Sequence, residues 1–388
     1  MILYSSDKMT YKTPYNPSRR NILRGICATG VGLALTLNPL SPEVFGSVGL
    51  GERGREHSTL EDELMLQPEI LFNSNRINGK GDVFLMDANG DNQRPLTNNN
   101  CTNYNGSWFP DGKKVIYGLR GRDKIYRIGL VNSDGTGQKI LPNFPGENRF
   151  NPKCYPDGRS ISYLSVVGGV GNICRIDTDG NFLANLTQGI EGSKRDYAIS
   201  PNGEELAVIV ENRGDEKVIT PGDVVIMDSV DGGNRRTLLE RSVYPSPPLW
   251  SPDGEYLYFM FFDRGGCDAF RVNQADGNKV ILTEGRGDGK SFTLSPNGEK
   301  FYYTSNNQGR HEIFGVNSNG EGERTRLTDD DFSGWSPAIS PDGKFLAGVT
   351  KEENGVWDQI FAMKISEPWK RKVLTKIGNN HSPAWRPK

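Results

Sequence analysis

A tripeptide of Pro, then Asp or Asn, then Gly recurs along this chain at nearly constant intervals. Successive copies lie 44 to 51 residues apart, and they begin at Pro110, Pro156, Pro201, Pro252, Pro296 and Pro341. Self-similarity at a fixed period of roughly 20–50 residues is typical of solenoids, propellers and other repeat architectures. The repeat therefore restricts the chain to folds in which one small unit is stacked many times.

Each repeat carries signals for four short strands, called A to D here in chain order. Strand-forming residues dominate after each triplet, as at 255–259. A later strand ends in a dipeptide such as Asn319-Gly320, which supplies the positive φ angles of a tight hairpin turn. The last strand closes with Leu-Thr or a related pair, as at Leu327-Thr328. Four antiparallel strands in roughly 40–50 residues predict the blade of a β-propeller, an all-β fold.

The number of blades follows from the last strands, which close at Leu96, Leu141, Leu186, Leu239, Leu282, Leu327 and Leu374. These count seven, whereas the triplets count six. The first unit begins in a strand B at 70–72, and the final residues, 382–388, have the pattern of a strand A. We therefore predict a seven-bladed propeller of four-stranded antiparallel blades, closed by the C-terminal strand joining blade one. A six-bladed ring is the alternative.

Two segments carry a resemblance to a known family. Residues 250–259 (Trp-Ser-Pro-Asp-Gly-x-x-Leu-x-Phe) and 294–303 (Leu-Ser-Pro-Asn-Gly-x-x-Phe-x-Tyr) resemble the repeats of TolB-type propellers, which are also described as WD40-like. The resemblance covers residues 69–388 and implies the propeller fold, while it says little about activity. TolB proper has an α/β domain before its propeller. Only about 20 residues separate the N-terminal signal from blade one here, so we expect a TolB-like protein without that domain.

The N-terminal residues have the pattern of an export signal. The pair Arg19-Arg20 precedes a mildly apolar segment that extends from Ile26 to Leu40. This order resembles a bacterial twin-arginine signal, and the alternative is a short amphipathic or anchoring helix. Glycines within the apolar segment disfavour a helix. We expect a signal peptide at 1–46, a linker at 47–68 and the propeller at 69–388, in a protein that is periplasmic or secreted.

Composition limits the classes of partner. The chain has 46 basic and 48 acidic residues and a net charge of −2, which gives no reason to expect a nucleic-acid partner. No apolar run long enough to span a membrane follows residue 50. We expect a monomer without a membrane span after signal removal.

Residues that support catalysis are sparse. The three histidines are His57, His311 and His381, and only His311 is placed by the pattern in a loop that could reach a site. Seven-bladed pectate-fragment lyases of related fold use a histidine cluster around a metal, and this chain has too few histidines for that. The acidic hairpin turns lack the later bidentate acid of a calcium loop. We therefore expect no catalytic residue, metal or cofactor. The pairing of the four cysteines beyond the signal, Cys101, Cys154, Cys174 and Cys267, is left open.

Strand direction divides the connections between two faces of the ring. The A–B and C–D turns lie on one face, called the turn face, and the B–C and D–A connections lie on the opposite face, called the loop face. We expect the loop-face connections to be longer and to carry the binding site, since binding residues concentrate on variable loops held by a rigid scaffold. The longest connection is expected at 211–223. The candidate binding residues on this face are Arg120, Arg122, Arg195, Arg264, Arg286, Arg310, His311, Trp335 and Trp357.

These expectations lead to a function hypothesis with one alternative. The chain is predicted to be an exported binding module for an unidentified protein or for an anionic or carbohydrate ligand. A carbohydrate-active enzyme, either a polysaccharide lyase or a hydrolase with its site on the loop face, is the alternative. A third view of the arginines is that they pair with nearby acids such as Glu147, Asp196 and Asp329 as a solvated rim.

Overall fold

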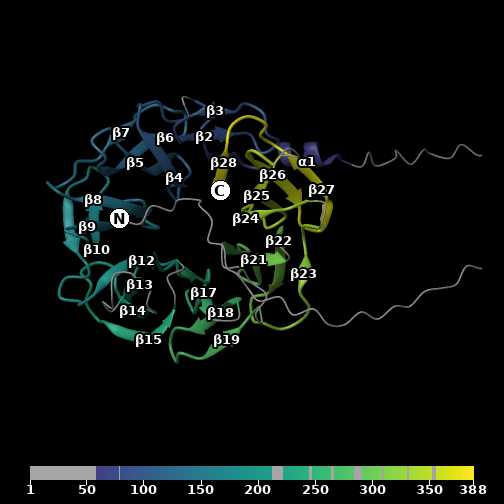
Figure 1. Cartoon of the computed structure of the whole chain (residues 1–388). Coiled ribbons are helices and arrows are strands. Elements are labelled where there is room, and N and C mark those ends of the chain that lie inside the picture. The colour runs from purple at the N-terminus through teal and green to yellow at the C-terminus, as the bar shows by residue number, and fades with distance from the viewer. Residues whose placement is uncertain are drawn as a thin grey trace, which may run out of the picture. The chain divides into compact units, whose positions relative to one another are not determined.

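The computed structural model describes residues 58–388 with the exception of 78, 212–221, 244–246, 264–265, 284–290, 308–309, 330–331 and 352–354. Seven four-stranded antiparallel sheets are arranged in a ring, as Figure 1 shows. The prediction of seven blades is therefore confirmed, and the six-bladed alternative is wrong. None of the described helices is both long and apolar enough to cross a membrane.

The strands follow the same order in every blade, from the innermost strand A to the outermost strand D. Blade 1 contains β28 (Asn380–Trp385), β1 (Ile70–Ser74), β2 (Asp82–Met86) and β3 (Arg94–Pro95). Blade 2 contains β4 (Thr102–Trp108), β5 (Lys114–Arg120), β6 (Tyr126–Asn132) and β7 (Lys139–Ile140). Blade 3 contains β8 (Asn148–Cys154), β9 (Ser160–Val167), β10 (Val170–Asp177) and β11 (Phe182–Asn185). Blade 4 contains β12 (Ser193–Ile199), β13 (Glu205–Glu211), β14 (Gly222–Asp228) and β15 (Arg236–Val243).

The remaining three blades complete the ring. Blade 5 contains β16 (Leu249–Trp250), β17 (Tyr256–Asp263), β18 (Gly266–Asn273) and β19 (Lys279–Ile281). Blade 6 contains β20 (Phe292–Leu294), β21 (Lys300–Asn307), β22 (Arg310–Asn317) and β23 (Thr325–Arg326). Blade 7 contains β24 (Trp335–Ile339), β25 (Phe345–Lys351), β26 (Asp358–Lys364) and β27 (Glu367–Val373).

The ring closes through the C-terminal strand, as the sequence predicts. Strand β28 pairs antiparallel with β1, so that Ile70 lies opposite Trp385 and Leu71 lies opposite Ala384. Blade 1 is therefore assembled from the two ends of the described chain. This closure leaves no strand A unpaired at the point where the ring begins and ends.

The triplets recur because each one completes the same turn. Ser251 Oγ accepts a hydrogen bond from the Tyr256 backbone N–H (2.9 Å) and donates to Asp253 Oδ1 (2.5 Å). Gly254 has a φ of 77°, in the left-handed region that a side chain disfavours. The Leu-Thr pairs have a similar structural role, since Thr375 Oγ1 accepts from the Ile360 N–H (2.8 Å) and donates to Gln359 Oε1 (2.8 Å). These motifs build blades and give no information about a ligand.

Neighbouring blades are joined near the axis by the tryptophans that precede the triplets. The indole N–H of each bonds a backbone carbonyl on the next blade, from Trp108 to Ala384 (3.2 Å), from Trp250 to Ala198 (3.3 Å) and from Trp385 to Ala338 (3.0 Å). These three side chains therefore pack between adjacent blades.

A short helix lies within the segment predicted to be a linker. Helix α1 (Leu60–Met65) begins with a capping box, in which Thr59 and Asp62 satisfy each other's backbone N–H groups. Leu64 is fully buried in the core between blades 7 and 1. Glu63 pairs with Lys364 (2.8 Å), and Glu61 pairs with Lys372 (2.9 Å). The helix therefore packs against the ring beside β26 and β27, as Figure 1 shows.

The loop face differs from the prediction in the length of its connections. Only Gly168 and Gly169, both with positive φ, separate β9 from β10. The connections 264–265 and 308–309 are equally short, so B–C connections are not uniformly long. Most of the predicted longest connection, 211–223, lies outside the described residues.

Candidate functional site

The innermost strands of four blades are interrupted by a bulge close to the loop face. Each bulge contains one residue other than glycine with a φ between 46° and 55°, namely Asn105, Asn151, Ser336 or Ser382. Every one of them precedes a Pro or a Gly. The register between strands A and B shifts at these points. The residues before each bulge therefore do not continue the alternation of side chains that the rest of the strand follows. These residues line the loop-face edges where adjacent blades meet, called seams here.

The seam between blades 6 and 7 brings two of the predicted residues together. The rings of His311 in β22 and Trp335 in β24 meet edge to face, with 5.8 Å between their centroids. The sequence prediction that Trp335 lies in a loop is wrong, because Trp335 begins β24 and pairs with Val349. The bulge at Ser336 hides this strand from a simple alternation pattern.

The seam between blades 7 and 1 carries a histidine that sequence reasoning set aside. His381 lies near the start of β28, where partial loss of contact with water lowers its pKa and the negative charge of Asp358 opposes that shift. Burial also raises the pKa of Asp358, and Lys351 and His381 oppose the rise. Trp357 precedes Asp358 in a bend, and its side chain is 43% exposed. The prediction that Trp357 lies in a loop is confirmed.

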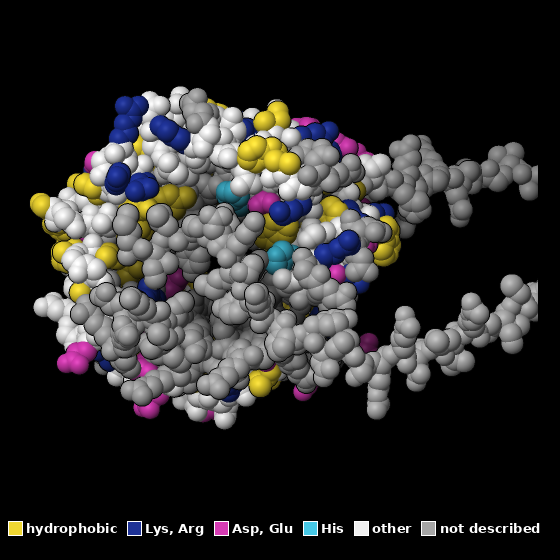
Figure 2. Space-filling view, viewed as in Figure 1, with side chains coloured by type: hydrophobic (Ala, Val, Ile, Leu, Met, Phe, Trp, Pro, Cys, Tyr) yellow, Lys and Arg dark blue, Asp and Glu magenta, His cyan; other side chains and the backbone are white. Residues whose placement is uncertain are grey.

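Figure 2 shows histidine, basic and acidic side chains near the middle of one face of the ring. The side chains at the loop-face ends of blades 6, 7 and 1 are together called the mouth here. They include the contacting pair His311 and Trp335 and the electrostatic neighbours Lys351, Asp358 and His381. Arg310 and Trp357 are exposed in the same blades. The signal that could have identified His381 is its place at the loop-face end of a strand A.

The seam between blades 2 and 3 holds Arg120 among aromatic rings. Its guanidinium carbon lies 5.4 Å from the centroid of Tyr126. Tyr126 in turn meets Tyr104 edge to face (6.0 Å) and Phe150 in a tilted contact (4.5 Å). Gly118 makes room for this cluster, because a Cβ there would lie 2.4 Å from Tyr104 Cε2.

The other predicted arginines are spread around the ring. Arg122 is exposed in the B–C turn of blade 2, and Arg310 is exposed at the start of β22. The guanidinium group of Arg195 forms an ion pair with the carboxylate of Glu211 (2.5 Å). Arg264 and Arg286 lie outside the described residues. The structure therefore does not gather all the predicted residues into one cluster. It brings His311 and Trp335 into contact, while Arg120, Arg122 and Arg195 lie in blades 2 and 4.

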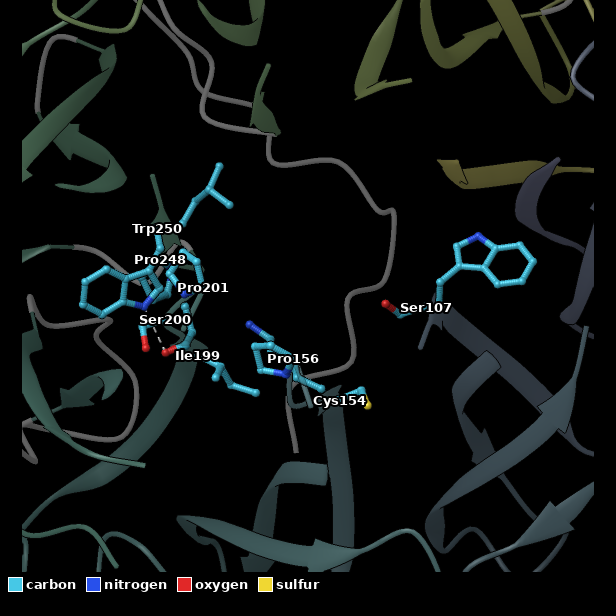
Figure 3. A pocket seen from close by; sticks show the side chains of 12 residues that line it. Ser107, Cys154, Pro156, Ile199, Ser200, Pro201, Pro248 and Trp250 are labelled. Carbon is cyan, nitrogen blue, oxygen red and sulfur yellow. Dashed lines mark hydrogen bonds between the residues drawn. The ribbon is translucent and has the colours of Figure 1, made fainter. Parts of the chain in front are cut away.

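A cavity lies on the opposite side of the ring, at the turn-face ends of the inner strands of blades 2 to 5. Its volume is about 370 Å³. Figure 3 shows Pro201, Pro248 and Trp250 on one side of the cavity and Ser107 on the other, with Cys154 and Pro156 between them. None of the predicted binding residues lines it. Sequence reasoning missed this cavity because its walls are residues that also serve the repeat.

The lining of the cavity exposes polar and apolar surface in about equal amounts and offers one charged group. Lys153 donates to the Tyr197 carbonyl and lies 3.6 Å from Asp196 Oδ1, so its charge is already satisfied. Burial raises the pKa of the Cys154 thiol to about 12, which disfavours the reactive thiolate. The cavity can accept an apolar group, but it presents no activated nucleophile.

Among the residues that the structure describes, no group of three or more His, Cys, Asp or Glu side chains could hold a metal ion. Cys101, Cys154 and Cys174 are free thiols.

The family of the chain follows from the repeat, the closed ring and one comparison. Residues 198–388 match the family model described as the TolB beta propeller domain. The chain is a TolB-type β-propeller protein. This agrees with the resemblance carried by residues 250–259 and 294–303.

Relatives of this propeller differ in what surrounds the shared repeats. An uncharacterized protein of Agrobacterium fabrum is 31% identical over 194 residues, which cover 47% of this chain and 63% of that protein. The Tol-Pal system protein TolB of Bordetella pertussis is 26% identical over 260 residues, which cover 62% of this chain and 53% of that protein. The crystal structure of TolB from Acinetobacter baumannii matches with a TM-score of 0.52 and 18% identity, covering 83% of this chain and 67% of that one. The matched region spans between 28% and 63% of the first curated relatives, and likeness at such low structural identity shows the fold alone.

Proposed function

We propose that this TolB-type propeller is an exported binding module that holds a partner protein at the mouth on the loop face. The observation that carries the proposal is that ionisable and aromatic side chains of three adjacent blades interact at their loop-face ends. His311 and Trp335 contact each other there, and His381 lies within the electrostatic reach of Asp358. Such convergence of polar groups and aromatic rings is typical of binding sites.

The scaffold beneath the mouth supports the proposal physically. Strands β24 and β28 are both innermost strands of their blades. The indole N–H of Trp385 in β28 donates a hydrogen bond to the backbone carbonyl of Ala338 in β24. Side chains on such rigid elements lose little further freedom when a partner binds, which favours affinity. Trp357 adds a large, exposed and amphipathic ring, a residue type enriched at protein interfaces.

The relatives named as Tol-Pal system proteins support a role in binding other proteins of the cell envelope. Their propellers resemble this one over about 62% of this chain. An envelope location also fits the twin-arginine pattern at the N-terminus. The identity of the partner is open, and the test therefore uses capture rather than a chosen ligand.

The first prediction concerns capture of partners by immobilised protein from an envelope extract. Arg310→Glu, Trp357→Ala and His381→Ala should each reduce recovery of captured protein by about tenfold, since central interface residues cost about 1–2 kcal/mol or more when removed. Recovery is measured by quantitative mass spectrometry. The matched controls are Lys113→Glu and Lys344→Glu on the turn face, which should bind as the unmodified protein does.

A further variant separates the mouth from the axial cavity. Ser107 is exposed within the cavity, so Ser107→Trp should fill it without touching the loop face. Capture should survive this change. If Ser107→Trp abolishes capture while the mouth variants retain it, the binding site is the cavity and the proposal is wrong.

The second prediction concerns export. Arg19→Lys combined with Arg20→Lys should leave the uncleaved precursor in the cytoplasm, because the pathway recognises the arginine pair rather than its charge. Cell fractionation and immunoblotting measure the distribution of the protein. Normal export of the double variant would remove the twin-arginine proposal and leave the binding proposal standing.

The enzymatic alternative uses the same mouth and makes a different prediction. A polysaccharide lyase or hydrolase should release products from uronate-containing or neutral polysaccharides, and His311→Ala should abolish this release. Turnover with that dependence on His311 would replace the binding proposal.

A further inference from the structure

The geometry points to a carboxylate-binding subsite at the seam between blades 2 and 3, where Arg120 receives an acidic group of the bound partner polypeptide. This inference rests on the proposed function, since it names the chemistry of the partner that the loop face binds. The subsite is separate from the mouth, which lies at the seams of blades 6, 7 and 1.

The first support is an excess of positive charge. Arg120 has no ion pair with any described residue, while the nearest acidic residue in its turn, Asp123, accepts from both terminal nitrogens of Arg127. Arg122 and Lys124 are exposed in the same turn and add two further positive charges. The seam therefore carries several positive charges, while the carboxylate in the same turn, that of Asp123, is already paired with Arg127.

The second support is a shortage of hydrogen-bond acceptors beside Arg120. Its Nε and the hydroxyl of Tyr104 are both buried without a hydrogen-bond partner in the described structure. Burial also raises the pKa of Tyr104, so that its hydroxyl keeps its proton and can donate. Buried polar groups are normally paired, and a donor-rich seam suits a ligand that supplies acceptors. A carboxylate supplies them in the planar form that matches a guanidinium group.

The third support is the fixed position of the guanidinium group. Arg120 stacks over Tyr126 in a cation–π contact, which holds the plane of the group without consuming its donors. The Tyr126 backbone N–H donates to Asn148 Oδ1 (3.0 Å), which fastens this ring to blade 3. The pre-set geometry reduces the entropy lost when a carboxylate binds.

The same contacts favour a polypeptide over a carbohydrate. A sugar ring binds an aromatic side chain by lying flat on an open face. Here Arg120 covers Tyr126, and Phe150 contacts Tyr126 at 4.5 Å, so these rings are already engaged with each other. Their partly exposed edges can still contact an apolar side chain. An acidic residue next to an aromatic or aliphatic residue supplies both groups.

The test measures binding of defined probes to the whole protein by isothermal titration calorimetry. The probe is an amidated, acetylated pentapeptide of alternating Asp and Phe, and its matched control replaces each Asp by Asn. We expect the acidic peptide to bind and the Asn peptide to bind at least about tenfold more weakly. Arg120→Gln should weaken the acidic peptide by about tenfold or more, as expected for loss of a charged hydrogen bond. Arg120→Lys should recover part of the loss, because it restores the charge without the planar fork.

Control variants and other probes distinguish the possible outcomes. Lys113→Gln, on the turn face, should leave peptide binding unchanged. Equal binding of the peptide to the unmodified protein and to Arg120→Gln would overturn the inference, as would no binding of the acidic peptide at all. Binding of trigalacturonate or inorganic phosphate, but not of the peptide, with dependence on Arg120 would replace the polypeptide by a different anion. Envelope capture that fails in Trp357→Ala but persists in Arg120→Gln would leave the proposed function standing and remove this subsite.

Discussion

Removal of residues 380–388 is expected to prevent the propeller from folding into a closed ring. The deletion removes β28, which supplies every hydrogen bond that β1 makes on its inner side. It also removes Trp385, which packs in the core between blades 7 and 1 and donates to Ala338. Loss of one large aromatic core side chain alone costs about 3–5 kcal/mol. The total stability of a domain is only about 5–15 kcal/mol. The truncated protein should therefore be insoluble or show no cooperative melting transition.

A shorter truncation controls for the loss of length. Removing 387–388 leaves β28 complete and keeps Arg386, which pairs with Glu69 (2.7 Å). This variant should melt within a few degrees of the full chain. Differential scanning calorimetry compares the three proteins. If the longer truncation melts like the full chain, the ring closes by some other contact and the account of blade 1 given above is wrong.

The fold was predictable because the repeat encodes it redundantly. The triplets, the Asn-Gly and Asp-Gly turns and the Leu-Thr pairs each mark one place in a blade, and their structural roles appear in residues such as Ser251 and Thr375. Closure was predictable because the first unit lacks a strand A and the chain ends in one. Helix α1 was missed because six residues give almost no periodicity, and its stability comes from burying Leu64 against the ring.

The candidate site was predictable only in part. The alternation of strand direction correctly divides the connections between two faces. It could not show that Trp335 begins a strand, since the bulge at Ser336 breaks the alternation. The interaction of His381 with Asp358 carried no sequence signal, because the strand pattern does not specify which side chains approach each other at the ends of neighbouring strands. These residues come from consecutive blades and from the closing strand β28, so their meeting depends on the closed ring.

One ion pair differs from the solvated rim considered from sequence. Glu147 and Arg149 do pair, but both side chains are almost completely buried, at 2% and 1% exposure. Glu147 accepts from Arg149 Nε (2.7 Å), Ser165 Oγ (2.7 Å) and Tyr163 OH (3.1 Å). The guanidinium of Arg149 also lies over the Tyr163 ring (4.6 Å). This buried network joins the start of β8 to β9 and leaves no charge available to a ligand.

Glu147→Gln is expected to destabilise the protein by about 3–5 kcal/mol, because it leaves the positive charge of Arg149 buried without a counter-ion. Chemical denaturation measures this change in the free energy of unfolding. The double variant Glu147→Leu with Arg149→Met removes both charges and should recover most of the loss, since apolar groups of similar size often replace a buried ion pair at little cost. The exposed pair of Arg127 and Asp123 offers a matched control, and Asp123→Asn there should lower the free energy of unfolding far less than Glu147→Gln does. Equal effects at the two pairs would show that burial does not govern their contributions.

Acidification should reproduce the effect of Glu147→Gln without a mutation. Burial alone would raise the pKa of Glu147, but the hydrogen bonds from Ser165 and Arg149 outweigh it and hold the pKa below 4.5. A carboxyl group whose pKa is lowered by folding stabilises the folded state above its unfolded pKa, and this contribution is lost as the pH falls through the folded pKa. The free energy of unfolding should therefore fall below about pH 4.5 in the unmodified protein. The fall should be shallower in the double variant, which has no carboxyl group to protonate at this site. If both proteins lose stability with the same pH dependence, Glu147 does not carry the acid sensitivity assigned to it.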